Sequence, residues 1–156
     1  MEAGRFTSLF LFFGALGGFS GGALADRFGG KNVISFSMLL SSPFIAAFLL
    51  TEGASSYTLL ALGGVALLST VPVNVVMAQN LAPQSASMVS ALMMGFAWGM
   101  GGMLVPLIGK IADTAGLSRA LMVVAMLPLA GFAVSLLLPK REGTRAVLPK
   151  PLTSEE

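Results

Sequence analysis

The residues best suited to chemistry form one short polar stretch, GGALADRFGGK, between two apolar runs. It brings a carboxylate, Asp26, close to a guanidinium, Arg27, and an ammonium group, Lys31. Neighbouring charges of this kind suit ion pairing and contacts with helix ends. They do not indicate catalysis, because no nucleophile and base accompany them. Gly22 would permit close helix contact, and Gly29 would permit a positive φ in a tight turn. We therefore predict a polar turn between two helices.

The residue content excludes several other chemistries. The chain of 156 residues has no Cys and no His, which argues against disulfides, thiol catalysis, haem and most zinc or copper sites. Its nine Lys and Arg residues fall mostly in gaps between apolar runs, so they are expected to report membrane topology rather than a nucleic-acid partner. We predict no catalytic residues, no metal site, no cofactor and no enzyme.

The elements that must position this turn are apolar helices. The chain is 55% hydrophobic and 10% charged, with a mean hydropathy of +0.87. A bilayer core about 30 Å thick needs roughly 20 apolar helical residues to cross it. The segments that qualify are 7–25, 33–50, 57–78, 87–111 and 119–138. The sequence thus predicts an all-α polytopic membrane protein with five transmembrane helices in a lipid bilayer.

The connections between these segments are short, so neighbouring helices are expected to run antiparallel. Basic residues favour the cytoplasmic side of the membrane. With the first loop inside, the inner side carries Arg27, Lys31, Lys140, Arg141, Arg145 and Lys150, and the outer side carries Arg5, Lys110 and Arg119. This distribution predicts an external N-terminus and a cytoplasmic C-terminus. Residues 140–156 are polar and contain proline, which predicts a disordered cytoplasmic tail.

Small residues recur at intervals of four in two of the predicted helices. The stripes are Gly14, Gly18 and Gly22 in the first, and Ser87, Ala91, Gly95 and Gly99 in the fourth. Such stripes let helix backbones approach closely in lipid, where packing replaces the hydrophobic effect. Either static packing or sliding of the helices would fit this pattern.

Two polar or aromatic residues lie deep in the predicted spans. Asn74 follows Pro72, which removes a backbone donor from the third span. Its amide requires either a partner helix or a ligand. Trp98 lies too deep in the fourth span for an interfacial anchor, so it either packs in the bundle or lines a cavity. We predict that Asn74 and Trp98 face a central substrate cavity.

The opening stretch resembles the loop signature G-x-L-A-D-R-x-G-R-K of the major facilitator superfamily. The matching residues are Gly22, Leu24, Ala25, Asp26, Arg27, Gly29 and Lys31, whereas Gly30 replaces the usual Arg or Lys. The resemblance implies a cytoplasmic turn with a gating role for Gly22, Asp26, Arg27, Gly29 and Lys31. A weaker echo, Gly109-x-x-x-Asp113-x-x-Gly116, repeats its spacing three crossings later, as an inverted repeat would.

A longer stretch, AQNLAPQSASMVSALMMGFAWGMGG, is similar to fosmidomycin-resistance-type efflux proteins of bacteria. This resemblance implies that the five helices are the eighth to twelfth of a twelve-helix fold, most of its C-terminal half. It further implies proton-coupled efflux of a small-molecule substrate by alternating access in the bacterial inner membrane, with the N-terminal half as the missing partner. The alternative is an independent or truncated small membrane protein without transport activity of its own.

Overall fold

The structure, a computed structural model, describes residues 2–138 and is helical throughout its regular elements. The elements are α1 (Glu2–Phe28), α2 (Gly30–Leu50), α3 (Ala54–Leu68), α4 (Thr70–Leu81), the short 3-10 helix η1 (Pro83–Ser85), α5 (Ala86–Ala115) and α6 (Leu117–Ser135). The predicted all-α fold is confirmed. The predicted tail, 140–156, lies outside the described residues.

Five helical segments of the described chain are long and apolar enough to cross a membrane, as predicted. They are Gly4–Phe28, Gly30–Leu50, Ala54–Leu81, Pro83–Ala115 and Leu117–Ser135. Two details differ from the predicted spans. The third span, predicted over 57–78, is the longer segment Ala54–Leu81, within which α3 and α4 meet at Ser69, and the last helix ends at Ser135 rather than at residue 138.

The break between α3 and α4, at Ser69, interrupts the hydrogen-bond ladder but not the helical course, because Ser69 keeps φ and ψ angles of −60° and −24° and its amide donates to the Val65 carbonyl at 3.2 Å. The interruption has a local cause. Pro72 has no amide hydrogen to donate to the Leu68 carbonyl one turn earlier. The hydroxyl groups of Ser69 and Thr70 donate back to the carbonyls of Ala66 and Leu67, each at 2.7 Å, a pattern that bends helices. Proline alone does not split a helix in this chain, because α2 and α5 continue through Pro43 and Pro106.

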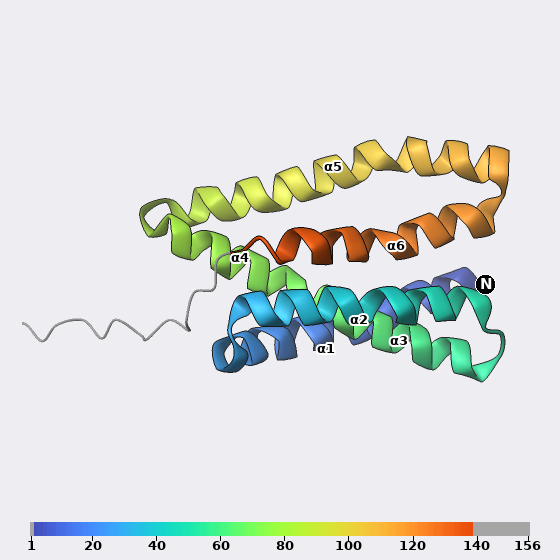
Figure 1. The fold of residues 1–156 in the computed structure, drawn as a ribbon, viewed down its shortest axis with the longest axis horizontal. Helices are drawn as coiled ribbons and strands as arrows, with labels where there is room; N and C mark the ends of the chain where they lie inside the picture. The colour runs from blue at the N-terminus through green and yellow to red at the C-terminus, as the bar shows by residue number, and fades with distance from the viewer. Residues whose placement is uncertain (1, 139–156) are drawn as a thin grey trace, which may run out of the picture.

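The helices are packed side by side, with α1, α2 and α3 forming one group, α6 lying on α2, and α5 on the outer side of α6 (Figure 1). The α1–α2 turn, the α4–α5 connection and the end of α6 lie at one end of the molecule. The α2–α3 and α5–α6 connections lie at the other end. Both sets of connections are therefore separated by the length of a helix, as antiparallel membrane spans require.

The first glycine stripe differs from the prediction. A Cβ at Gly17 or Gly21 would overlap the carbonyl oxygen of Val65 or Ser69, so these glycines let α1 touch α3 and the break. A Cβ at Gly22 would meet nothing within 4 Å, so Gly22 makes no close helix contact among residues 2–138. Because a helix has 3.6 residues per turn, steps of four drift off a face that mixed steps of three and four retain. The contact face is therefore Gly14, Gly17 and Gly21.

The second stripe makes no helix contact within the described chain. A Cβ at Gly95 or Gly99 would meet nothing within 4 Å, and none of the thirty residues of α5 is buried. The predicted packing face at Ser87, Ala91, Gly95 and Gly99 is therefore not used at Gly95 and Gly99 among residues 2–138, and its contact with further helices stays a prediction. The physical reason is that α5 contacts α4, η1 and α6, and its remaining surface has no neighbour among residues 2–138.

Hydroxyl groups join α2 to α6. Ser42 Oγ donates to the Ala125 carbonyl at 2.5 Å, and the hydroxyl groups of Ser35 and Ser135 lie 2.7 Å apart. Both ends of this seam involve buried side chains, since Ser42 and Ser135 are almost fully covered. Interhelical hydrogen bonds of this kind assist association where lipid replaces water.

Candidate functional site

The α1–α2 turn consists of a single residue, Gly29, between the two helices. Its φ of 85° and ψ of 137° are reached easily only by glycine, which confirms the predicted positive φ. The Gly29 amide donates to the Ala25 carbonyl at 2.9 Å, and its own carbonyl accepts from the Val33 amide at 3.3 Å. The turn thus reverses the chain while its backbone groups stay paired.

Asn32 is a residue of this turn that the sequence analysis missed. Its side-chain amide donates to the Phe28 carbonyl at 3.0 Å, one of the last carbonyls of α1. Helix ends leave such carbonyls without intrahelical donors. An Asn placed directly after the glycines and Lys31 is the sequence signal for this role.

Asp26 and Arg27 are exposed on the last turn of α1. Within the described chain they form no ion pair with each other, so the predicted option of an Asp26–Arg27 contact is not realised. The Arg27 guanidinium instead lies 5.9 Å from the ring centre of Phe28, which is itself 59% exposed. These residues present a carboxylate, a guanidinium and an aromatic ring at one end of the molecule.

Lys31 is directed elsewhere. Its Nζ donates to the Leu136 carbonyl at 2.8 Å and also to the Leu138 carbonyl, at the end of α6. Leu138 packs against the buried cluster of Val33, Ile34 and Val73. The charged residues of the predicted gating motif are therefore divided between Asp26 and Arg27, which are exposed, and Lys31, which is half-buried against the end of α6.

Gly30, the residue that departs from the superfamily signature, is closely packed. A Cβ at this position would lie 2.6 Å from Met77 Sδ and 3.2 Å from Val73 Cγ1. Both partners belong to α4. The close approach of α4 to the turn thus occupies the space that a side chain would need.

The structure does not join the two predicted cavity residues in one pocket. Asn74 is half-buried on α4, and its side chain makes no hydrogen bond within residues 2–138. Trp98 on α5 is 79% exposed, so it does not pack inside the described bundle. The exposure has a simple reason, because this face of α5 has no neighbour in the described chain.

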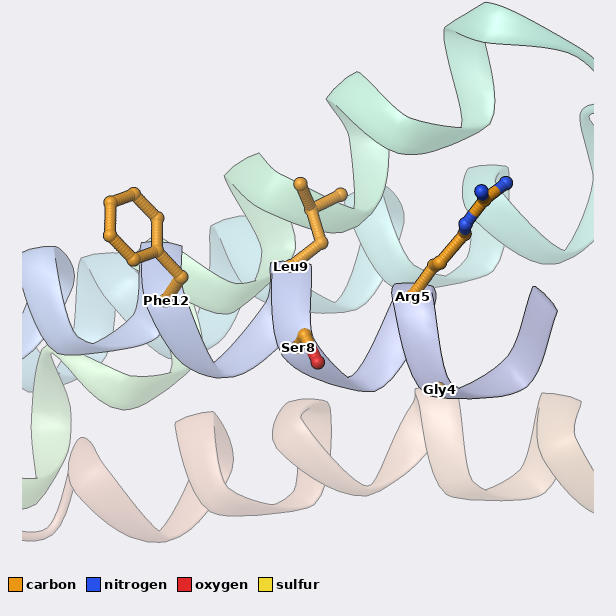
Figure 2. A pocket seen from close by; sticks show the side chains of 5 residues that line it. All are labelled: Gly4, Arg5, Ser8, Leu9 and Phe12. Carbon is orange, nitrogen blue, oxygen red and sulfur yellow. The ribbon is translucent and has the colours of Figure 1, made fainter. Parts of the chain in front are cut away.

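Two shallow pockets lie along α1, and neither includes Asn74 or Trp98. The larger, about 630 Å³, is lined by Gly4, Arg5, Ser8, Leu9 and Phe12. Figure 2 shows the side chains of Arg5, Leu9 and Phe12 rising from the same side of the helix. The second, about 420 Å³, lies between α1 and the α3–α4 break and is lined by Leu11, Gly14, Ala15, Gly18, Phe19, Leu68, Val71 and Pro72. Both are open grooves rather than enclosed binding sites.

A polar contact that the sequence analysis did not single out joins α4 to α5. Gln79 Nε2 donates to Ser90 Oγ at 2.6 Å, and the Ser90 hydroxyl donates to the Ala86 carbonyl at 2.8 Å. The contact lies next to the α4–α5 connection. It couples the part of the third span beyond the Ser69 break to the start of α5.

Comparison with known proteins agrees with this arrangement. The family model of the Major Facilitator Superfamily matches residues 1–154. The uncharacterised MFS-type transporter YfnC of Bacillus subtilis (strain 168) is 39% identical over 144 residues, which is 92% of this chain and 35% of the relative. The fosmidomycin resistance protein of Escherichia coli (strain K12) is 38% identical over 124 residues, 78% of this chain and 30% of the relative. No solved structure matches.

The chain thus spans about a third of the length of these curated relatives. The match covers nearly all of its residues, and its five membrane-length helices fit part of such a fold. The predicted resemblance, and the prediction of a transporter family rather than an enzyme family, are confirmed. The chain belongs to the Major Facilitator Superfamily.

Proposed function

We propose that this chain forms the last five helices of a twelve-helix transporter that exports small molecules. The observation that carries the proposal is the bare surface of α5. This helix is apolar enough to span a membrane, yet none of its residues is buried. A helix with glycines and a tryptophan on unpartnered faces suits a protein in which further helices complete the bundle. The missing helices would be the N-terminal half and one more span.

The proposed mechanism is alternating access, in which the two halves rock around a site near the middle of the bilayer. The break at Ser69 supports it, because Pro72 leaves a backbone bond unmade there, so that α4 can bend relative to α3 while Gln79 and Ser90 hold α4 to α5. We assign Asp26 and Arg27, with Gly22 and Gly29, to a gate on the cytoplasmic side. The assignment is supported because Asp26 and Arg27 are exposed and form no ion pair in the described chain. Asn74 and Trp98 would face the cavity once the remaining helices are present.

The coupling ion is proposed to be the proton, and the location the bacterial inner membrane, with the N-terminus of this chain outside. The chain has no His, and the acidic residues of its described helices lie near helix ends, at positions such as Asp26 and Asp113. Proton-binding residues are therefore assigned to the missing part. The second candidate, an independent small membrane protein, has in its favour only that the five helices already pack into one group.

Reading the coding sequence directly upstream would separate the two candidates. An in-frame segment that encodes seven more spans supports the transporter, and a stop codon with no such segment contradicts it.

The activity is tested with the full-length protein in a drug-sensitive strain and in inverted membrane vesicles with a proton gradient. Fosmidomycin is the first compound to try, because one relative is named for resistance to it. We expect export that collapses with the gradient. Asp26→Ala should slow export about tenfold, the effect of losing roughly 1.4 kcal/mol in the rate-limiting step. Asp113→Ala, the matched change at the opposite end, should have a smaller effect. Unchanged export by Asp26→Ala at an equal protein level would contradict the assignment of Asp26 to the gate.

A further inference from the structure

Lys31 is the charged residue of the α1–α2 turn that reaches back into its own bundle. Its Nζ donates to the carbonyl oxygens of Leu136 and Leu138, more than one hundred residues away in sequence. Asp26 and Arg27, on the same turn, are exposed and make no comparable contact within residues 2–138. One short motif therefore has charged groups with two uses, since Lys31 contacts the end of α6 and Asp26 and Arg27 stay exposed.

The chemistry of a helix end explains the choice of partner. Leu136 is the residue that caps α6, and Leu138 lies in the turn just beyond it, so both carbonyls are close to the helix end, where the dipole places a partial negative charge. An ammonium group with three donors on a flexible stem suits two carbonyls at once. Leu138 packs against Val33 and Ile34 on α2, so the apolar contact and the Lys31 contact hold the same end of α6.

The neighbouring position strengthens this reading. A side chain at Gly30 would run into the side chains of Met77 and Val73 of α4, so a second basic residue there requires these side chains to move. The turn therefore contacts α4 through Gly30 and α6 through Lys31. The end of α6 lies at the same end of the molecule as this turn (Figure 1), and α4 meets the turn through Val73 and Met77.

We infer that Lys31 is a positioning residue that fastens the carboxyl end of α6 to the α1–α2 turn, so that turn and helix end move as one body. Its task is separate from the outward contacts assigned to Asp26 and Arg27. The inference deepens the proposed function and rests on it only for the consequence in transport. The fastening itself is a property of the bundle.

Hydrogen–deuterium exchange of the full-length protein in lipid nanodiscs tests the fastening without any substrate. The amides of Leu136, Leu137 and Leu138 donate to Phe132, Val134 and Ser135, so their exchange reports on the end of α6. Lys31→Gln should speed exchange of the peptide 132–138 about tenfold, because a charge-assisted contact to its carbonyls is lost. Lys31→Arg should keep exchange near the wild-type rate. Arg27→Gln removes a charge from the same turn and is the matched control for exchange.

The inference is overturned if Lys31→Gln leaves exchange at 132–138 unchanged, or if Arg27→Gln speeds it equally. A rise spread evenly over α1, α2 and α3 also overturns it, because Lys31 would then be a general folding residue. Should Lys31→Gln not accumulate in the membrane, Lys31→Met retains an apolar stem for insertion and replaces it in the same measurement. In vesicles we expect Lys31→Gln and Lys31→Met to lower the maximal export rate and leave the half-saturating concentration unchanged. Absence of export by every form would contradict the proposed function and leave the exchange result to decide the fastening.

Discussion

Gly29 and Gly116 have the same backbone geometry at opposite ends of the molecule (Figure 1). Their φ and ψ angles are 85° and 137° at Gly29 and 93° and 150° at Gly116. Each amide donates to the carbonyl four residues earlier, at 2.9 Å and 3.0 Å, and each carbonyl accepts from the amide four residues later. An Asp stands three residues before each glycine. The echo seen in the sequence thus coincides with a repeated turn, which supports the interpretation as an inverted repeat.

Replacing either turn glycine by alanine should destabilise the protein to a similar extent. A side chain at this φ and ψ is strained, at a cost of about 1–3 kcal/mol. Neither position is crowded, since a Cβ would meet nothing within 4 Å, so strain alone is tested. Gly22→Ala, also uncrowded but helical, is the control and should be neutral or stabilising, because alanine is the better helix former by about 1 kcal/mol. Denaturant unfolding in detergent measures all three, and equal effects of Gly29→Ala and Gly22→Ala would contradict the assignment of strain.

The glycine face of α1 gives a second prediction. A Cβ at Gly17 would overlap the Val65 backbone, whereas a Cβ at the next residue, Gly18, would lie 3.8 Å from the Leu68 carbonyl oxygen. Gly17→Ala should therefore lower the free energy of unfolding by about 1–3 kcal/mol, the usual cost of overpacking. Gly18→Ala should be neutral or stabilising, because alanine is the better helix former by about 1 kcal/mol. Thermal unfolding compares the two variants, and a Gly18→Ala protein less stable than the Gly17→Ala protein would contradict the proposed contact face.

Hydropathy and charge placement predicted the five spans, because a membrane imposes length and apolarity on each of them. The tight turn was also predictable, since Gly29 is flanked by the signature that requires it. The partner of each helix face was not. Steps of four pointed to Gly18 and Gly22, whereas contact depends on the angle at which α3 crosses α1.

Contacts between distant segments were equally hidden. The residues around Lys31 do not predict its contact with the end of α6, because a lysine at the membrane surface ordinarily faces water. The same holds for Gln79 and Ser90, which meet because α4 and α5 fold back on each other. For Asn74 and Trp98 the sequence predicted a shared cavity that residues 2–138 do not form. Such a cavity would need further helices to enclose it.

Adjacent serines on α2 provide a third prediction. Ser41 and Ser42 are both almost fully buried, but Ser42 donates across to α6 at Ala125, whereas Ser41 donates to Met38 of its own helix. Ser42→Ala should lower the free energy of unfolding by about 0.6 kcal/mol, the average for such bonds in membrane bundles. Ser41→Ala should have a smaller effect, because it removes no interhelical bond. Unfolding in mild detergent compares the pair, and a larger loss from Ser41→Ala would contradict the seam between α2 and α6.

Pro72 gives the last prediction, which joins stability to the proposed movement of α4. Alanine at this position restores an amide that can donate to the Leu68 carbonyl, so the α3–α4 break should close. We expect slower hydrogen exchange over residues 69–76, and a gain in stability of up to about 3 kcal/mol. If the break serves as the bend for alternating access, export should fall severalfold although the protein is more stable. Pro43→Ala is the matched control, because α2 is already continuous through its proline, and it should leave export unchanged. Wild-type export by Pro72→Ala, together with the slowed exchange that shows the break has closed, would show that the bend at Ser69 is not needed for transport.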